Sequence, residues 1–510
     1  MRISKDIAEN IVAPATVPGS GAVGIIRLSG PDVLTIADSI LTLSSHIRGK
    51  RPTLKNTDSY KMRFARIYTQ DKAQNQSLVD EVLSVPFRAP NSYTGENCVE
   101  IYCHASSFIE NRIQQLLIDS AKSLFKNSRI SSPLRIAEPG EFTKRAYLNG
   151  KMDLAQAEAV ADLIAAETEA SHSIAMNQMR GGFSQELRDL RESLLNLCAL
   201  MELELDFSEE DVEFADRKKL SGILNSTYQK IKDLADSFSL GNAIKNGIPV
   251  AIVGAVNTGK STLLNLILGE ERAIVSPIQG TTRDTIEDTV NIGGTLFRFI
   301  DTAGIRNTTQ TIEIMGIERT WQKLRESSVV ILMLDCTRED SFSPSIKTIA
   351  EKTDKKRQKL IILANKLDKV KASGKHGSDE DNKVQKEITD SIKSICKKLK
   401  LSDVTIHTLS LKKDKEVSKT IIGDTLKKLG KGFLSNLQGK TYVTNLRHYQ
   451  ALKDAMASIE RVFNGLKTNL PTDLLAQDLR EATDDLGSII GEISSQDILS
   501  HIFSHFCIGK

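Results

Sequence analysis

The sequence predicts three kinds of domain: an N-terminal α+β domain, a central α-helical domain, and an α/β domain inserted into the helical one. Three observations predict this arrangement. Short strand-like runs such as VGIIRLS and CVEIYCH, separated by turn residues, fill the first part of the chain. A long helical pattern follows and resumes near the C-terminus. Between its two parts lie continuous apolar runs that alternate with polar or helical stretches, which is typical of a covered parallel sheet.

The composition is that of an ordinary globular protein. The chain has 510 residues, 40% apolar and 26% charged, with a net charge of +3, so no overall basic field indicates nucleic-acid binding. The six cysteines lack zinc or disulfide spacing, which predicts packing roles and a reducing compartment. The N-terminus has no signal-peptide pattern and no apolar run is long enough to span a membrane, so we expect a cytoplasmic protein.

The expected domain boundaries follow these changes in character. We assign residues 1–149 to the N-terminal domain, 150–244 to the first helical part, 245–434 to the α/β domain and 435–510 to the second helical part, which should pack back on the first. Two glycine-containing stretches, 239–249 and 429–440, are interpreted as joints, and 372–383 as a polar surface loop. One narrow apolar seam is expected to be core: Phe183, Leu187, Leu190, Leu194, Leu197, Met201 and Leu205.

A phosphate-binding loop opens the α/β domain. Gly254 to Ser261 matches G-x-x-x-x-G-K-[ST] between the strand-like PVAIVG and the helix-like STLLNLIL. In this pattern, backbone N–H groups surround the β-phosphate, Lys260 neutralises β/γ charge and the Ser261 hydroxyl binds Mg²⁺.

Two further motifs define the nucleotide. Asp301-x-x-Gly304 follows the strand-like LFRFI, where the Asp can hold a Mg²⁺ water and the Gly N–H can reach the γ-phosphate. Asn365-Lys366-Leu367-Asp368 ends the strand-like KLIILANK, and the Asp368 carboxylate matches the N1–H and N2–H₂ donors of guanine. The sequence therefore predicts a guanine-nucleotide domain, with Ser410 as a weaker element of the base loop.

These motifs do not identify the group that orients the attacking water. Thr281 and Thr282 occupy the place of a switch loop that completes the Mg²⁺ shell, but Ile305 stands where a Ras-like enzyme has the glutamine that orients water.

The sequence resembles the MnmE (TrmE) family of tRNA modification GTPases over almost its whole length. Several stretches outside the nucleotide motifs carry the resemblance: VPGSGAVGIIRLSG, NSYTGENCVEIYCH, AEPGEFTKRAYLNGKMDLAQAEAVADLI, GTTRD, GIER and the terminal FCIGK. The resemblance implies a homodimer whose N-terminal domain binds folate and dimerises. It also implies a heterotetramer of two such chains with two copies of the FAD protein MnmG, which adds a folate-derived aminomethyl-type group (carboxymethylaminomethyl) to C5 of the wobble uridine U34 of certain tRNAs.

The resemblance also implies how the missing glutamine is replaced. One K⁺ per subunit would take the place of an arginine finger, held by Asn257, Thr281 and the backbone carbonyls of Ser276 and Ile278. Glu313 would orient the water through a bridging water, and Ser261 and Thr282 would bind Mg²⁺. The implied GTP-binding set is Asn257, Thr258, Gly259, Lys260, Ser261, Thr262, Ser276, Pro277, Ile278, Gln279, Gly280, Thr281, Thr282, Asp301, Thr302, Ala303, Gly304, Asn365, Lys366, Leu367 and Asp368. Its catalytic residues would be Glu313, Asn257 and Lys260, with Cys507 added for the modification reaction.

The implied folate site combines opposite charges. Arg27, Glu100, Lys151 and Lys510 match family positions for a 5-formyl- or methylene-tetrahydrofolate, whose pterin presents donors and whose tail is anionic. Cys507 is either a nucleophile or acid/base in the modification, or a small residue that seats the tail so that Lys510 reaches the folate. Where many members have CHGG, this chain has Cys103-His104-Ala105-Ser106, so it lacks two glycines near the implied folate site.

Two other functions compete with this interpretation. A ribosome-assembly GTPase should carry an RNA-binding appendage, and no KH-type GXXG loop with suitable flanks is present. A nucleotide-gated scaffold for MnmG would hydrolyse little GTP.

Overall fold

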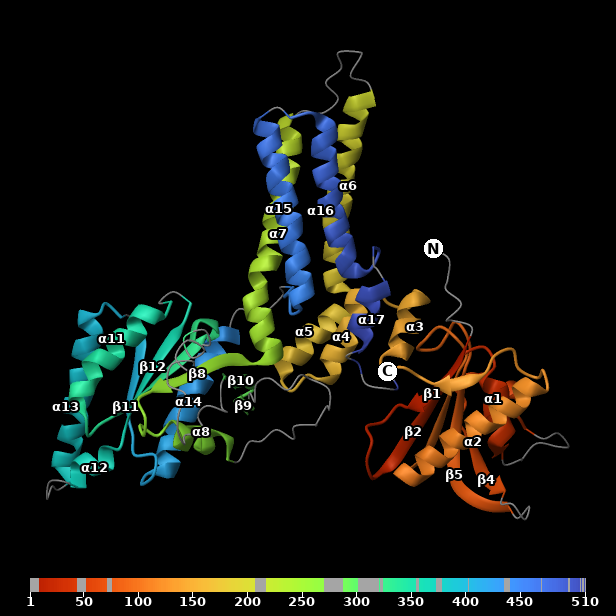
Figure 1. Ribbon diagram of the computed structural model, residues 1–510, viewed down its shortest axis with the longest axis horizontal. Helices are drawn as coiled ribbons and strands as arrows, with labels where there is room; N and C mark the ends of the chain where they lie inside the picture. The colour runs from red at the N-terminus through yellow and green to blue at the C-terminus, as the bar shows by residue number, and fades with distance from the viewer. Residues whose placement is uncertain are drawn as a thin grey trace. The chain divides into compact units, whose positions relative to one another are not determined.

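The computed structural model divides the chain into two compact units, each described by itself below (Figure 1). The first comprises Met1–Ala161, Gln178–Phe214 and Leu470–Lys510, and the second comprises Asp162–Asn177 and Ala215–Asn469. Among the described residues, no helix is both long and apolar enough to cross a membrane. The structure describes residues 9–43, 52–70, 76–206, 217–269, 288–300, 321, 324–354, 357–372, 378–401, 403–434, 441–468, 470–493, 496–504, 506 and 509.

A seven-stranded sheet organises the N-terminal part of the first unit. Its strand order is β3–β4–β5–β6–β2–β1–β7, antiparallel except for the parallel β1–β7 pair. The predicted strands VGIIRLS and CVEIYCH are confirmed as parts of β2 and β6. The strands are β1 (Asn10–Pro14), β2 (Gly21–Ser29), β3 (Leu41–Leu43), β4 (Arg63–Gln70), β5 (Gln76–Phe87), β6 (Cys98–Ala105) and β7 (Leu134–Ile136).

Helices α1 and α2 cover one face of this sheet (Figure 1). Side chains alternate along a strand, and Val99, Ile101 and Cys103 of β6 accordingly enter the core beneath the helices. The intervening positions of β6 point to the opposite face and are half-buried or exposed. This second face therefore carries Glu100 and Tyr102 of β6.

The remaining helices of the first unit include the predicted apolar seam. Helix α6 packs on α16, so the C-terminal part of the chain returns to the earlier helices. All members of the seam from Phe183 to Met201 are buried, while the side chain of Leu205 lies outside the described residues. The helices are α1 (Val33–Ile40), η2 (Leu54–Asn56), α2 (Ser107–Lys126), α3 (Glu141–Leu148), α4 (Leu154–Ile164), α6 (Gly182–Asp206), α16 (Thr472–Ile490) and α17 (Gln496–Ser504).

The second unit contains the predicted α/β domain. Its six-stranded sheet has the order β13–β12–β11–β8–β10–β9, with only β9 antiparallel to its neighbour. The expected strands PVAIVG, LFRFI, SVVILMLD and KLIILANK are confirmed. The strands are β8 (Ile248–Gly254), β9 (Asp288–Ile292), β10 (Thr295–Ile300), β11 (Val329–Asp335), β12 (Lys359–Asn365) and β13 (Val404–Thr408).

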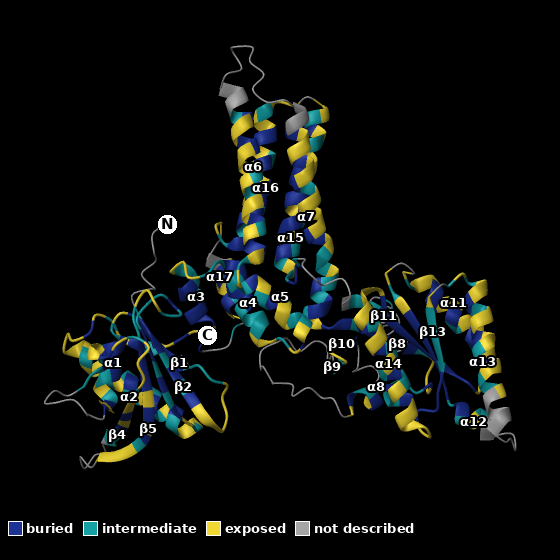
Figure 2. Ribbon diagram, turned by 180° about the vertical axis from the view of Figure 1, so that it is seen from behind, coloured by how far each residue is buried: buried dark blue, intermediate teal, exposed yellow. Residues whose placement is uncertain are grey.

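Both faces of this sheet are covered by helices, which explains the continuous apolar runs. Every residue of β11 is buried, and Figure 2 shows buried residues throughout this layer. Val329 and Ile331 join the core beneath α8 and α14, whereas Val330 and Leu332 join the core beneath α11 and α13. The helices of the unit are α5 (Glu169–Met179), α7 (Arg217–Asn246), α8 (Lys260–Leu268), η4 (Glu339–Ser341), α11 (Phe342–Lys352), α12 (Leu367–Ala372), α13 (Ser378–Lys398), α14 (Lys415–Leu434) and α15 (Leu446–Lys467).

The joint predicted over residues 239–249 is wrong, because α7 continues to Asn246. Gly241, in this segment, is a position of close packing. A Cβ on Gly241 would lie 2.2 Å from the carbonyl oxygen of Val443, so the absent side chain lets the segment before α15 approach the helix closely. Phe238 of α7 also stacks on Tyr449 of α15, with ring centroids 4.5 Å apart.

Two other expectations of irregular structure need correction. The first part of the joint at 429–440 belongs to α14, where a Cβ on Gly430 would lie 2.5 Å from the Thr295 hydroxyl oxygen. The loop expected over 372–383 is shorter, since α13 begins at Ser378. The acids that follow Ser378 suit a helix N-terminus, whose partial charge is positive. The domain boundaries after residues 149, 244 and 434 stay predictions.

Two glycines of α7 give a test of this packing. Gly241→Ala should destabilise the protein by about 1–3 kcal/mol because the new methyl meets a backbone carbonyl that cannot retreat freely. Gly222→Ala is the matched control: nothing lies within 4 Å of its Cβ, so it should stabilise the helix by about 0.5–1 kcal/mol. Urea unfolding followed by circular dichroism measures both, and equal stability of the two variants would contradict the packing role.

Candidate functional site

The predicted phosphate loop connects β8 to α8 and depends on its glycines. Gly254 and Gly259 have φ of 152° and 108°, and Asn257 is left-handed at 66°. A Cβ would lie 2.5 Å from the Met333 carbonyl oxygen at Gly254 and 2.4 Å from the Asn365 amide nitrogen at Gly259. Glycine is therefore required at both positions by conformation and by close contact.

The Lys260 ammonium lies inside this loop. Its Nζ donates to the carbonyl oxygens of Gly254 at 2.9 Å and Ala255 at 2.8 Å, and burial lowers its pKa. The Thr258 hydroxyl also donates to the Ala255 carbonyl, at 2.9 Å. These are neutral acceptors, so a phosphate, which forms stronger charge-assisted bonds, can draw the ammonium away from them. Ser261 follows, half-buried at the start of α8.

The side chain of Asn365 joins three segments of the site. Its amide nitrogen donates to the Thr258 carbonyl at 2.9 Å, and its amide oxygen accepts from the Leu411 N–H at 3.1 Å. The residue is only 5% exposed. One amide thus connects the phosphate loop, the end of β12 and the loop after β13.

The predicted base-reading residues lie together at the ends of β11, β12 and β13. The Asp368 N–H donates to the Ser410 hydroxyl at 3.0 Å, which places Ser410 beside the expected guanine-reading residue. Lys366 has a left-handed φ of 68° and forms an ion pair with Asp335 at 2.6 Å.

Asp335 is a residue of this site that the sequence argument missed. Burial by itself raises the pKa of its carboxyl, but hydrogen bonds from Lys366 and Thr337 outweigh burial and hold the pKa below its ordinary value. The available signal was its place as the last residue of the apolar run VVILMLD, at the same sheet edge as Asn365.

Much of the predicted catalytic set falls on residues that the structure does not describe. The residues outside the described part are Ser276, Pro277, Ile278, Gln279, Gly280, Thr281, Thr282, Asp301, Thr302, Ala303, Gly304, Glu313, Cys507 and Lys510. Strand β9 follows the segment from Ser276 to Thr282 in the sequence, and β10 ends just before Asp301. This antiparallel pair therefore connects the expected switch loop to the expected γ-phosphate loop along the chain.

The N-terminal sheet brings together part of the predicted folate set. Arg27 of β2 lies opposite Glu100 of β6, and its Nε and Nη2 each lie 2.9 Å from Glu100 Oε1. The Tyr102 hydroxyl donates to Oε2 of Glu100 at 2.8 Å, and burial together with this bond raises the pKa of Tyr102 to about 12. Arg27 Nη1 donates to the Gly509 carbonyl at 3.3 Å, so the chain end lies beside this pair.

Lys151 contacts a different part of the chain from Arg27 and Glu100. It is exposed, and its Nζ donates to the Pro90 carbonyl at 3.1 Å. The Arg27 guanidinium instead lies over the rings of Tyr93 and Phe142, at 5.5 and 5.8 Å from their centroids. The structure therefore pairs Arg27 with Glu100 but does not show Lys151 in contact with either.

The cysteines of the described residues are unpaired thiols with buried side chains. Burial raises the pKa of Cys103 to about 12, with Glu110 and Asp80 adding to the shift, which makes a reactive thiolate unfavourable. Within the described ranges, no cluster of three or more His, Cys, Asp and Glu side chains could hold a metal ion.

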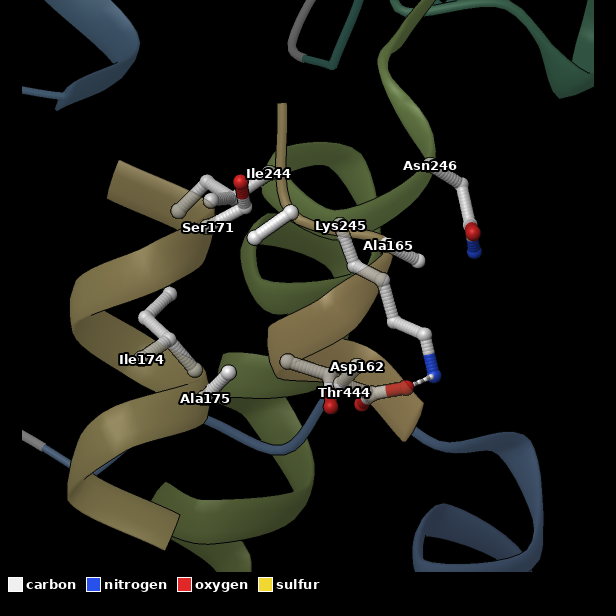
Figure 3. A pocket seen from close by; sticks show the side chains of 10 residues that line it. Asp162, Ala165, Ser171, Ile174, Ala175, Ile244, Lys245, Asn246 and Thr444 are labelled. Carbon is white, nitrogen blue, oxygen red and sulfur yellow. Dashed lines mark ion pairs between the residues drawn. The ribbon is translucent and has the colours of Figure 1, made fainter. Parts of the chain in front are cut away.

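A cavity of about 80 Å³ lies at the end of α7, away from the phosphate loop (Figure 3). Apolar residues from α5 and α7 line much of it, and at its edge the Lys245 ammonium faces Asp162 at 2.7 Å. None of the predicted nucleotide or folate residues lines it. Its size and lining indicate a packing gap rather than a nucleotide site.

Known proteins match this chain over nearly its whole length. The family described as "MnmE helical domain" matches residues 154–507, and "GTP-binding protein TrmE N-terminus" matches residues 10–151. "tRNA modification GTPase MnmE" of Bacteroides thetaiotaomicron is 46% identical over 504 residues, covering 98% of this chain and 99% of the relative. The protein of the same name from Flavobacterium johnsoniae is 44% identical over 506 residues, with the same coverage.

A solved structure of a GTP-binding protein from Sulfolobus solfataricus in complex with GDP gives a weaker likeness. It is 16% identical and covers 61% of this chain and 85% of that chain, with a TM-score of 0.25. A score this low adds nothing to the assignment.

Removing the Asn365 amide should loosen the nucleotide site. Asn365→Ala leaves the Thr258 carbonyl and the Leu411 N–H without their partner, which should destabilise the protein by about 1–3 kcal/mol. It should also weaken binding of a fluorescent GDP analogue, measured by titration. Asn265→Ala, on an exposed position of α8, is the matched control. An Asn365→Ala protein as stable and as tightly binding as this control would show that the bridge is dispensable.

Proposed function

This chain belongs to the MnmE (TrmE) family of tRNA modification GTPases, and we propose that it acts with the FAD protein MnmG on the wobble uridine of tRNA. Membership makes it a GTP-hydrolysing enzyme. In the proposed reaction a folate-derived carbon and an amine are added at C5 of the base, giving an aminomethyl-type group. The observation that carries the proposal is the 46% identity across 98% of the chain, which includes the regions outside the nucleotide motifs.

The nucleotide site would use K⁺ where other GTPases use an arginine. The proposed ligands are oxygen atoms from Asn257, Thr281 and the carbonyls of Ser276 and Ile278, a neutral oxygen set that suits K⁺. Asn257 supports this fit, since it is exposed at the tip of the phosphate loop and held in a left-handed conformation. A cation at this point stabilises charge that develops on the transferring phosphate, for which an arginine finger gives about 10³–10⁵ in rate.

The residues of the chain perform the remaining steps of hydrolysis. Lys260 would leave the carbonyls of Gly254 and Ala255 for the β- and γ-phosphates, and Ser261 would bind Mg²⁺ with Thr282. Glu313 would hold the attacking water in line through a second water. The Asp368 carboxylate would accept both donors of the guanine edge while Ser410 supports its loop through the Asp368 N–H.

The N-terminal sheet would hold the folate. Glu100 would accept from the donor edge of the pterin, and Arg27, Lys151 and Lys510 would provide positive charge for the ligand and its anionic tail. The contact of Arg27 with both Glu100 and the Gly509 carbonyl supports this assignment, because Gly509 is the neighbour of Lys510 in the sequence. A homodimer, a heterotetramer with MnmG and a cytoplasmic location complete the proposal.

The dependence on K⁺ gives a direct kinetic prediction. GTP turnover should be fast in K⁺ and fall by about 10³-fold or more in Na⁺, because only an ion of suitable size places charge at the transition state. Asn257→Ala should lose most of the rate and the difference between the two salts. Val256→Ala, at a position 72% exposed in the same loop, is the control and should behave as wild type. Equal kcat of the wild type in both salts would overturn the K⁺ assignment.

The proposed modification can be tested in cells. A strain that lacks this chain should lose the aminomethyl-type group at the wobble uridine, measured by mass spectrometry of tRNA nucleosides. The wild-type gene should restore it, whereas a Lys260→Ala gene, which lacks the phosphate-binding cation, should not. Unchanged wobble uridines in the deletion strain would rule out this function.

A further inference from the structure

The feature that carries this inference is an exposed histidine whose ring is held by a buried aspartate. The His104 side chain is 70% exposed, whereas that of Asp80 is 7% exposed. Asp80 Oδ1 lies 2.7 Å from His104 Nδ1, and Asp80 Oδ2 accepts the backbone N–H of His104 at 2.9 Å. An imidazole on the surface does not need a buried carboxylate for the fold to form.

His104 lies on β6, the strand that also carries Glu100 and Tyr102, whereas Asp80 lies on the neighbouring strand β5. Alternation along β6 places His104 on the face that also carries Glu100 and Tyr102, opposite the helix-covered core. His104 lies four positions after Glu100 along the strand, a distance of about 13 Å at roughly 3.3 Å per residue. The pairing of β5 with β6 runs from Phe87–Cys98 to Leu83–Tyr102, and beyond it the Asp80 carboxylate accepts the His104 N–H.

The geometry determines which ring nitrogen is available. An ionised carboxylate can only accept, so in the neutral imidazole the hydrogen resides on Nδ1 and Nε2 keeps its lone pair. The carboxylate also stabilises the imidazolium that forms when Nε2 takes a proton. In this arrangement the imidazole has a fixed orientation and its Nε2 can accept a proton.

A structural role explains only part of these contacts. Asp80 Oδ1 also accepts the Glu81 N–H at 2.9 Å, so the carboxylate supports the backbone of both strands. Those two backbone bonds require Asp80 but would persist with any residue at position 104. The ring contact is the additional element, and it can be removed without disturbing them.

We propose that His104, positioned by Asp80, is the base that deprotonates the amine donor of the modification reaction. The inference rests on the proposed function, in which an amine, ammonium or glycine, joins a folate-derived carbon. Such amines are protonated at neutral pH and cannot attack until they lose a proton. A base about 13 Å from the pterin-reading carboxylate leaves room for a pterin and a small nucleophile between the two groups.

The proton transfer balances without any further reactant. An N–H bond of the ammonium group breaks, its electron pair stays on the nitrogen, and the proton moves to Nε2 of His104. The free amine then attacks the one-carbon unit, and the imidazolium returns its proton to water. No electrons are gained or lost in this step.

The test uses the full chain reconstituted with MnmG, tRNA, GTP, K⁺, Mg²⁺, methylene-tetrahydrofolate and ammonium. His104→Gln should lower kcat for the aminomethyl nucleoside by about 10²-fold or more, the usual contribution of a general base. Binding of 5-formyltetrahydrofolate and the rate of GTP hydrolysis should equal those of the wild type. In His104→Ala, added imidazole should restore part of the modification rate. His172→Gln, at an exposed position of α5, is the matched control and should leave every readout unchanged.

The possible results separate this inference from the proposed function. Wild-type modification rates in both His104 variants would overturn the base assignment while the proposed function stands. Loss of 5-formyltetrahydrofolate binding in these variants would also overturn it, because His104 would then bind the cofactor. Failure of the wild-type chain to produce the nucleoside would overturn the proposed function, and with it the inference.

Discussion

The nucleotide site depends on one buried amide. Asn365 holds the Thr258 carbonyl of the phosphate loop and the Leu411 N–H of the base loop at the same time. Its side chain also lies where a Cβ of Gly259 would be, so the loop can close over it only because that position is glycine. Phosphate binding and base reading are therefore joined by packing around a single side chain, in addition to the backbone of the sheet.

The sequence predicted the strands and motifs of the α/β domain because both leave local patterns. The run SVVILMLD is continuous and apolar since β11 is covered on both faces, and the motif from Gly254 to Ser261 lies where a strand meets a helix. Gly241 and Gly430 were misinterpreted as joint residues for a physical reason. A helix-interior glycine usually weakens a helix, but here each admits a close neighbour, Val443 and Thr295, that the sequence alone could not identify.

Sequence patterns could not predict which residues far apart in the chain contact one another. Arg27 and Glu100 were selected through family resemblance, and only the antiparallel register of β2 and β6 shows them opposite each other. Asp335 and Asp80 were missed because each is one acid among many until the fold brings its partner to it. Asp335 meets Lys366 across neighbouring parallel strands, and Asp80 meets His104 where the β5–β6 pairing ends.

The chain end illustrates how backbone contacts can fix a segment that would otherwise fray. The Gly509 carbonyl accepts from the guanidinium that also holds Glu100. Its φ of 96° and the 1.8 Å that would separate a Cβ from the Pro14 carbonyl oxygen exclude other residues at this position. The close contacts of Gly509 with Arg27 and Pro14 agree with the interpretation in which this part of the chain is seated against the sheet. In that case the glycine of FCIGK is retained for its backbone, and the cysteine two residues earlier need not react for the tail to matter.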